Sequence, residues 1–249
     1  MTRRVLRWLV PGLLAYLIFL CASFPAVYAW HWLQPDLPNV RLSAVSGSIW
    51  SGQAGQLSIE SVPLGAVKWR FDWRALLSGA AGYRLHLGDD GLQLVGRAAV
   101  SHGQRIVIHD LSGRIPVRRL DHWLPLPAGS LDGVLDLDLQ TLVFSKGLPQ
   151  AADGRVVLDQ ASLNWPQTAV LGSYRMQLHT DKGIIGDIRD SSGPLLLQAR
   201  VTLQTGGQYR VQGTLSARDT ASAAARLLDN LGGPDSAGKH TFDFTGHLQ

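Results

Sequence analysis

An uncharged stretch near the N-terminus constrains this chain more than any other feature. After three arginines in the first seven residues, no Asp, Glu, Lys or Arg occurs before Asp36. Residues 8–27 are dominated by Leu, Ile, Phe, Ala and Val, and these 20 residues would span about 30 Å as a helix. That length matches the hydrocarbon core of a bilayer, and the stretch lacks the polar face of a soluble surface helix. We therefore predict a transmembrane anchor over residues 8–29.

The charges and aromatic residues around the anchor predict its orientation. Arginines lie only on its N-terminal side, so residues 1–7 form a basic tail that is expected in the cytoplasm. Tyr28, Trp30 and Trp32 follow the anchor, and such amphipathic rings are typical of a membrane–water interface. A secretory signal peptide cleaved after Ala29 is the competing interpretation, although the apolar run exceeds the roughly 7–15 residues of a signal core. Both interpretations export residues 30–249.

Alternation of apolar and polar residues dominates the exported part. Residues 135–139 read Leu-Asp-Leu-Asp-Leu, which is typical of a strand with one buried and one solvated face. Similar runs occur at residues 83–87, 174–179, 195–203, 209–212 and 241–245, and Gly- and Asp-rich turns separate them. The pattern predicts a mainly β fold: an antiparallel, hairpin-rich curved sheet in one domain. One helix is expected over residues 219–231, with shorter turns at 74–77 and 118–123.

Residues capable of chemistry are scattered along the chain. The 8 histidines include no His-Glu-x-x-His pair, and neither a Gly-x-Ser-x-Gly elbow nor a phosphate-binding glycine loop is present. Two charged groups are interpreted as solvated faces: Asp132, Asp136 and Asp138, and Arg114, Arg118 and Arg119. The sequence therefore predicts no catalytic residue, no cofactor and no metal site. The net charge of +4 is too small and too dispersed to indicate binding of nucleic acid.

An aromatic group interrupts the alternation near residue 70. Trp69, Phe71 and Trp73 are spaced to share one face of a strand, with Trp50 close in sequence and charged residues between them. Two interpretations stay open: a seam of the core, or an apolar strip that faces lipid or a partner.

Five segments together carry a resemblance to a known family. Residues 47–54 (Gly-Ser-Ile-Trp-Ser-Gly-Gln-Ala), 67–70, 75–79, 126–133 and 207–215, placed behind one membrane span, resemble the type II secretion system protein N family. The resemblance covers nearly the whole chain in matching order and implies a structural role for Gly47, Trp50, Gly52, Trp69 and Trp73. Residues 71–74 depart from it, because a more basic, proline-containing stretch is expected there.

The resemblance implies a non-enzymatic, single-pass protein of the bacterial inner membrane, with its β domain in the periplasm. Such a protein would act in the export of folded proteins across the outer membrane. The implied partners are other type II secretion subunits, those of the inner-membrane platform first and the outer-membrane channel second, together with membrane lipid. The chain is also similar to AsmA-like periplasmic proteins, whose curved sheets present an apolar groove. Lipid binding in such a groove or half-barrel is therefore the alternative function.

Overall fold

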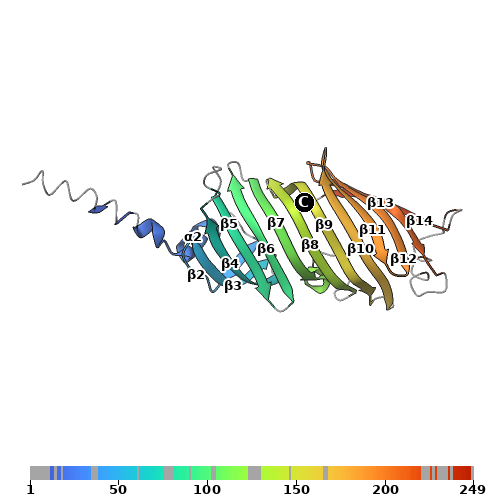
Figure 1. Ribbon diagram of the computed structural model, residues 1–249, viewed down its shortest axis with the longest axis horizontal. Coiled ribbons are helices and arrows are strands. Elements are labelled where there is room, and N and C mark those ends of the chain that lie inside the picture. Colours follow the sequence, from blue (N-terminus) through green and yellow to red (C-terminus); the bar gives the residue numbers. More distant parts are fainter. Residues whose placement is uncertain are drawn as a thin grey trace, which may run out of the picture.

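The computed structural model describes residues 12–13, 16–17, 19–34, 39–60, 62–73, 75, 81–89, 91–101, 105–122, 130–145, 147–164, 168–219, 225, 228, 235 and 238–247. Across these residues the chain forms one antiparallel sheet, drawn in Figure 1 as a twisted row of arrows. The colours in that view follow the sequence along the row, so neighbours in sequence are neighbours in space.

The sheet and the two described helices have the following bounds. The strands are β1 (Val40–Ser43), β2 (Ser46–Gly47), β3 (Ser51–Ile59), β4 (Val62–Asp72), β5 (Ala81–Asp89), β6 (Leu92–Ser101), β7 (Arg105–Pro116), β8 (Leu131–Ser145), β9 (Leu148–Leu163), β10 (Ala169–Thr180), β11 (Ile184–Ser192), β12 (Leu195–Leu203), β13 (Gln208–Ala217) and β14 (His240–His247). The helices are α2 (Ala26–Leu33) and the 3₁₀ turn η3 (Val117–Leu120).

From β3 onward each strand pairs with the next strand in sequence. The order is β1-β3-β4-β5-β6-β7-β8-β9-β10-β11-β12-β13-β14, and β2 pairs with β3. At about 4.8 Å between neighbouring strands, β1 and β14 lie roughly 60 Å apart along the sheet. The predicted mainly β, antiparallel, hairpin-rich fold is confirmed.

Within the described residues, the sheet is a single layer over most of its length. The chain exposes 16199 Å² of surface, whereas a globular protein of 27.0 kDa exposes about 10,800 Å². Among the described residues, the buried hydrophobic cluster consists of Leu195 and Leu228, with half-buried Leu171, Leu215 and Ala217 packed against it. The described parts therefore bury few apolar side chains beneath a second layer.

Only part of the predicted helices falls within the described residues. Residues 8–11, 14, 15 and 18 of the predicted anchor lie outside the described residues, as does most of the helix expected over 219–231. Within the part of the chain that is described, none of the helices is long and apolar enough to cross a bilayer. The turn expected at 118–123 is found as η3, which begins one residue earlier.

Candidate functional site

One face of the sheet is apolar from β4 to β14. Directly opposed residues share a face, and an unbroken row of such partners runs across the sheet. Its members are all apolar or glycine: Val67, Leu87, Leu94, Gly113, Leu137, Val156, Met176, Ile188, Ala199, Gly213 and Phe242. We call this side the apolar face.

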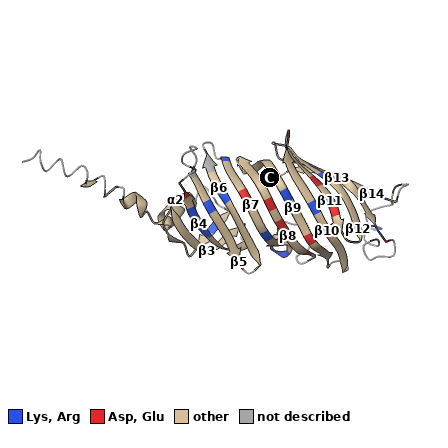
Figure 2. Ribbon diagram, viewed as in Figure 1, with Lys and Arg blue, Asp and Glu red and all other residues tan. Residues whose placement is uncertain are grey.

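The row one residue further along forms the opposite side, which we call the polar face. Its members are Lys68, His86, Val95, Ser112, Asp138, Arg155, Gln177, Asp187, Arg200, Gln212 and Asp243. Figure 2 shows the charged residues as bands across the strands. The sheet therefore has one solvated side and one side suited to an apolar partner.

Most charged residues on the polar face pair across strands. Arg114 and Arg118 bond Asp136 and Asp132, each at 2.7 Å. Arg119 instead reaches Asp89 at 2.9 Å, at the end of β5 and on the side of Leu87. The backbone N–H of Gly133 and the Arg118 guanidinium together lower the pKa of Asp132. The structure thus engages both charged groups of the sequence analysis in ion pairs. Among the described residues, no three His, Cys, Asp or Glu side chains gather as a metal site.

An aromatic cluster lies where β4 ends beside the N-terminal segment. Trp50 stacks on Trp73 with ring centroids 4.7 Å apart, and Phe71 contacts both rings edge-on. Tyr83 joins the cluster from β5, 5.2 Å from Phe71. Trp73 nevertheless stays 60% exposed, so the cluster combines a packed seam with an open apolar surface.

The glycines of the resembling segment allow close packing around a second tryptophan. Trp69 lies over Gly52, where an added Cβ would come within 2.5 Å of the indole ring. The indole N–H of Trp69 donates to the Ser48 carbonyl oxygen at 3.1 Å. Gly47 adopts a φ of +90°, which favours glycine. These placements explain why small residues stand at positions 47 and 52.

Helix α2 covers the apolar face at its β1–β5 end and leaves a cavity beneath it. The cavity has a volume of about 290 Å³. Its lining is apolar and comes from α2 and the sheet: Ala26, Ala29, Trp30, Leu33, Val40, Leu42, Val45, Ile49, Leu57, Val67, Trp69, Tyr83 and Leu85. Sequence reasoning did not identify this cavity, because it forms only when α2 folds back over strands far along the chain.

The three residues predicted at a membrane interface all lie on α2, in different surroundings. Trp30 is half-buried in the cavity lining, whereas Tyr28 is 62% and Trp32 is 74% exposed. Phe24 contacts the Trp32 ring at a centroid distance of 6.0 Å. The exposed face of α2 is thus aromatic.

Comparison with known proteins places this sheet in a family. The model of the family described as "Type II secretion system (T2SS), protein N" matches residues 38–242. No solved structure matches the chain.

Three similar proteins carry the name Type II secretion system protein N. The one from Aeromonas hydrophila is 28% identical, covering 95% of this chain and 96% of its own. That from Klebsiella pneumoniae is 30% identical over 86% of this chain and 84% of its own, and that from Vibrio cholerae is 24% identical over 84% and 86%. Because the family match spans nearly the whole sheet, β1 to β14, the chain belongs to the type II secretion system protein N family.

Proposed function

We propose that this protein is a non-enzymatic structural subunit of the type II secretion system. It would be held in the inner membrane by residues 8–29, with the sheet in the periplasm. The family match over residues 38–242 carries the proposal. In support, the described residues form a long single-layer sheet that presents wide faces and two edges, and many of their charged side chains form ion pairs across strands.

The edge strand β14 is a route for contact with another subunit. It lies at the opposite end of the sheet from β1, and an edge strand offers backbone groups for strand addition. Phe244 is 61% exposed on this strand and stacks on Phe242 with centroids 5.9 Å apart. Exposed Phe244, stacked on half-buried Phe242 at an edge of the described sheet, is a suitable anchor for a protein partner.

The proposal is tested in cells that carry the whole secretion system. A photo-crosslinking amino acid in place of Phe244 should crosslink to another subunit of the type II secretion system. The same amino acid in place of Thr205, in the β12–β13 hairpin, should not. Reporter fusions at Gln249 test the topology independently. Alkaline phosphatase fused there should be active, and a protein that fluoresces only in the cytosol should give no signal. Cytosolic activity of the reporter would refute the periplasmic placement.

The second candidate function is binding of a lipid chain on the apolar face. The apolar row and the cavity beneath α2 favour it, because each methylene buried there contributes about 0.8 kcal/mol. The cavity lies near the lower end of the roughly 300–1,000 Å³ found for small-ligand sites. A single acyl chain is therefore the expected occupant.

Mass spectrometry of gently extracted protein tests the lipid candidate. The wild-type protein should carry phospholipid. Ala29→Trp, which fills the cavity from α2, should reduce the amount of bound phospholipid. Val95→Trp places the same ring on the polar face and should leave the bound lipid unchanged. Wild-type protein without any lipid would remove this function.

A further inference from the structure

We propose that the polar face over β3–β6 binds anionic phospholipid headgroups at the surface of the membrane. We call this part of the face the basic patch, and it comprises Lys68, Arg70, Arg84, His86 and Arg97. The inference rests on the proposed membrane anchor, and it assigns a binding surface distinct from the apolar cavity.

Strand register concentrates positive charge in the basic patch. Arg70 of β4 lies directly opposite Arg84 of β5, which lies opposite Arg97 of β6. Lys68 lies opposite His86 in the same strand pair. Like charges directly opposite each other destabilise a sheet, so this arrangement opposes folding.

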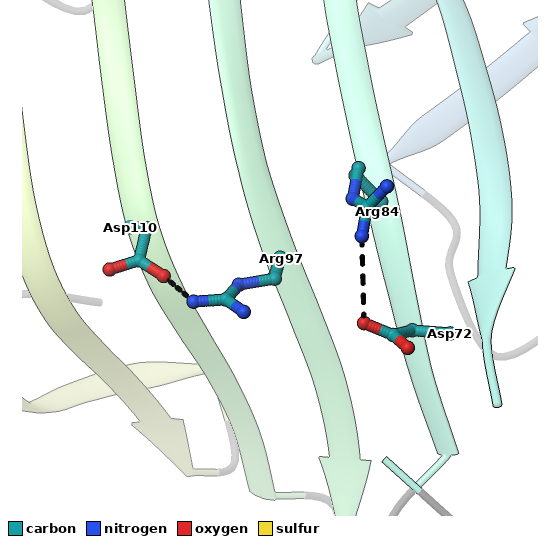
Figure 3. Close-up of polar contacts among 4 residues, drawn as sticks. All are labelled: Asp72, Arg84, Arg97 and Asp110. Atoms are coloured by element: carbon teal, nitrogen blue, oxygen red, sulfur yellow. Dashed lines mark hydrogen bonds and ion pairs between the residues drawn. The ribbon is translucent and has the colours of Figure 1, made fainter. Parts of the chain in front are cut away.

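Carboxylates at the two flanks compensate only part of this charge. Asp72 approaches Arg84 at 3.9 Å, and Asp110 forms an ion pair with Arg97 (Figure 3). Asp110 occupies the β-bulge of β7 with a φ of +51°. Two carboxylates thus face four permanently charged side chains, because Lys68 and Arg70 have no ion pair with a described residue.

Elsewhere the polar face usually places opposite charges together. Arg155 lies opposite Asp138, Arg200 opposite Asp187, and the Arg210 guanidinium pairs with Asp243. One further like-charged pair, Arg175 opposite Arg189, lies on β10 and β11 and is exposed. Arg189 also lines a concavity, but Asp187 shares that lining, so the basic patch differs from the pair by its larger uncompensated positive charge.

Four members of the basic patch, all except Arg97, line a concavity of about 670 Å³. Its walls also include Ser46, Gly47, Ser51 and Gln53, which supply hydroxyl, amide and backbone groups. Guanidinium and ammonium groups around such a hollow suit phosphate oxygens, which arginine can bind with two parallel hydrogen bonds.

The concavity lies beside the junction of the sheet and the N-terminal segment. Pro25 bridges Ser48, and the backbone N–H of Ile49 donates to the Phe24 carbonyl oxygen at 3.1 Å. Both contacts adjoin Gly47, which lines the concavity. With the part of residues 8–29 that precedes these contacts in the bilayer, the basic patch would lie near the headgroups, and each basic residue near an anionic surface strengthens binding roughly fivefold.

The test uses the full chain reconstituted in vesicles. Gln53→Cys, combined with Cys21→Ser, places a fluorescent label in the concavity, and a headgroup-attached nitroxide on phosphatidylcholine quenches it. One vesicle set is phosphatidylcholine alone, and the other contains about 30 mol% phosphatidylglycerol. Quenching should be several-fold stronger with phosphatidylglycerol and should weaken in about 0.5 M NaCl.

Matched variants separate this inference from a general charge effect. The double variant Arg70→Gln/Arg84→Gln should lower the equilibrium constant for docking of the basic patch on phosphatidylglycerol vesicles roughly 10- to 30-fold. The double variant Arg175→Gln/Arg189→Gln should leave that constant unchanged. Melting temperatures close to that of the parent would show that both variants fold.

Three results would overturn the inference. The first is equal quenching in both vesicle types, or none, while the protein survives a carbonate wash; this would leave the anchor standing. The second is loss of the protein itself in that wash, which would refute the anchor as well. The third is unchanged quenching but lost secretion in the Arg70/Arg84 variant, which would assign the basic patch to an acidic protein partner.

Discussion

The indole N–H of Trp50 donates a hydrogen bond to the backbone carbonyl oxygen of Cys21 at 2.8 Å. These residues lie 29 positions apart, and their contact joins the N-terminal segment to the aromatic cluster at the end of β4. The Ile49–Phe24 hydrogen bond and the Pro25–Ser48 bridge reinforce the same junction. The sheet therefore meets the N-terminal segment through several contacts rather than through a bare linker.

Trp50→Phe should weaken this junction without removing an aromatic ring. Phenylalanine retains the stack on Trp73 but loses the donor to Cys21, so we expect the free energy of unfolding to fall by about 1 kcal/mol. Urea unfolding followed by circular dichroism measures the change. Trp69→Phe is the matched variant, because it removes a bond to Ser48 instead. Unchanged stability in the Trp50 variant would show that the Cys21 contact contributes nothing.

Gly113→Ala should be strongly destabilising. Gly113 has a φ of +147°, and a Cβ there would approach the Gln93 carbonyl oxygen within 1.8 Å. Because β6 and β7 would have to separate, we expect a loss of about 2 kcal/mol or more. The control is Gly206→Ala in the β12–β13 hairpin, where a Cβ meets nothing within 4 Å. Equal midpoints of urea unfolding for the two variants would contradict the assigned register.

Asp187 should contribute stability that acid removes. A hydrogen bond from Arg200, at 2.7 Å, lowers the pKa of Asp187. A lowered folded-state pKa stabilises the protein above the unfolded value of about 3.9, and the effect disappears as pH falls through the folded-state pKa. The stability difference between wild type and Asp187→Asn should therefore vanish at low pH. Asp181→Asn, in an exposed hairpin, should follow the wild-type profile; a constant difference for Asp187→Asn would count against the ion pair.

Tyr174 should make stability sensitive to alkali. Burial, with a smaller contribution from Asp190, raises the pKa of Tyr174 to about 12, and its hydroxyl donates to the Leu171 carbonyl oxygen at 2.7 Å. The raised pKa stabilises the folded protein below pH 10, and this contribution is lost as pH rises toward 12. Tyr174→Phe should lose about 1 kcal/mol near neutral pH and show a flatter alkaline profile. Ionisation of Tyr174 near pH 10 in the ultraviolet titration would refute its burial.

Local sequence patterns specify which residues share a face within each regular stretch of strand. The alternation of residues 135–139 places Asp136 and Asp138 together, and the structure agrees. Gly and Asp turns between such runs also determined the antiparallel meander. Both signals are local, because a period of two and a tight turn depend only on neighbouring residues.

The alignment of the strands depends on tertiary pairing. The bulge at Asp110 shifts the register within β7, so Ile108 and Leu111 both lie on the apolar face although their spacing is odd. A similar irregularity in β8 returns Leu142 to that face. Such shifts arise from pairing between separate segments, which no periodicity within one segment specifies. For the same reason, the alignment of Arg70, Arg84 and Arg97, and the contact of Trp50 with Cys21, exist only once the sheet has formed.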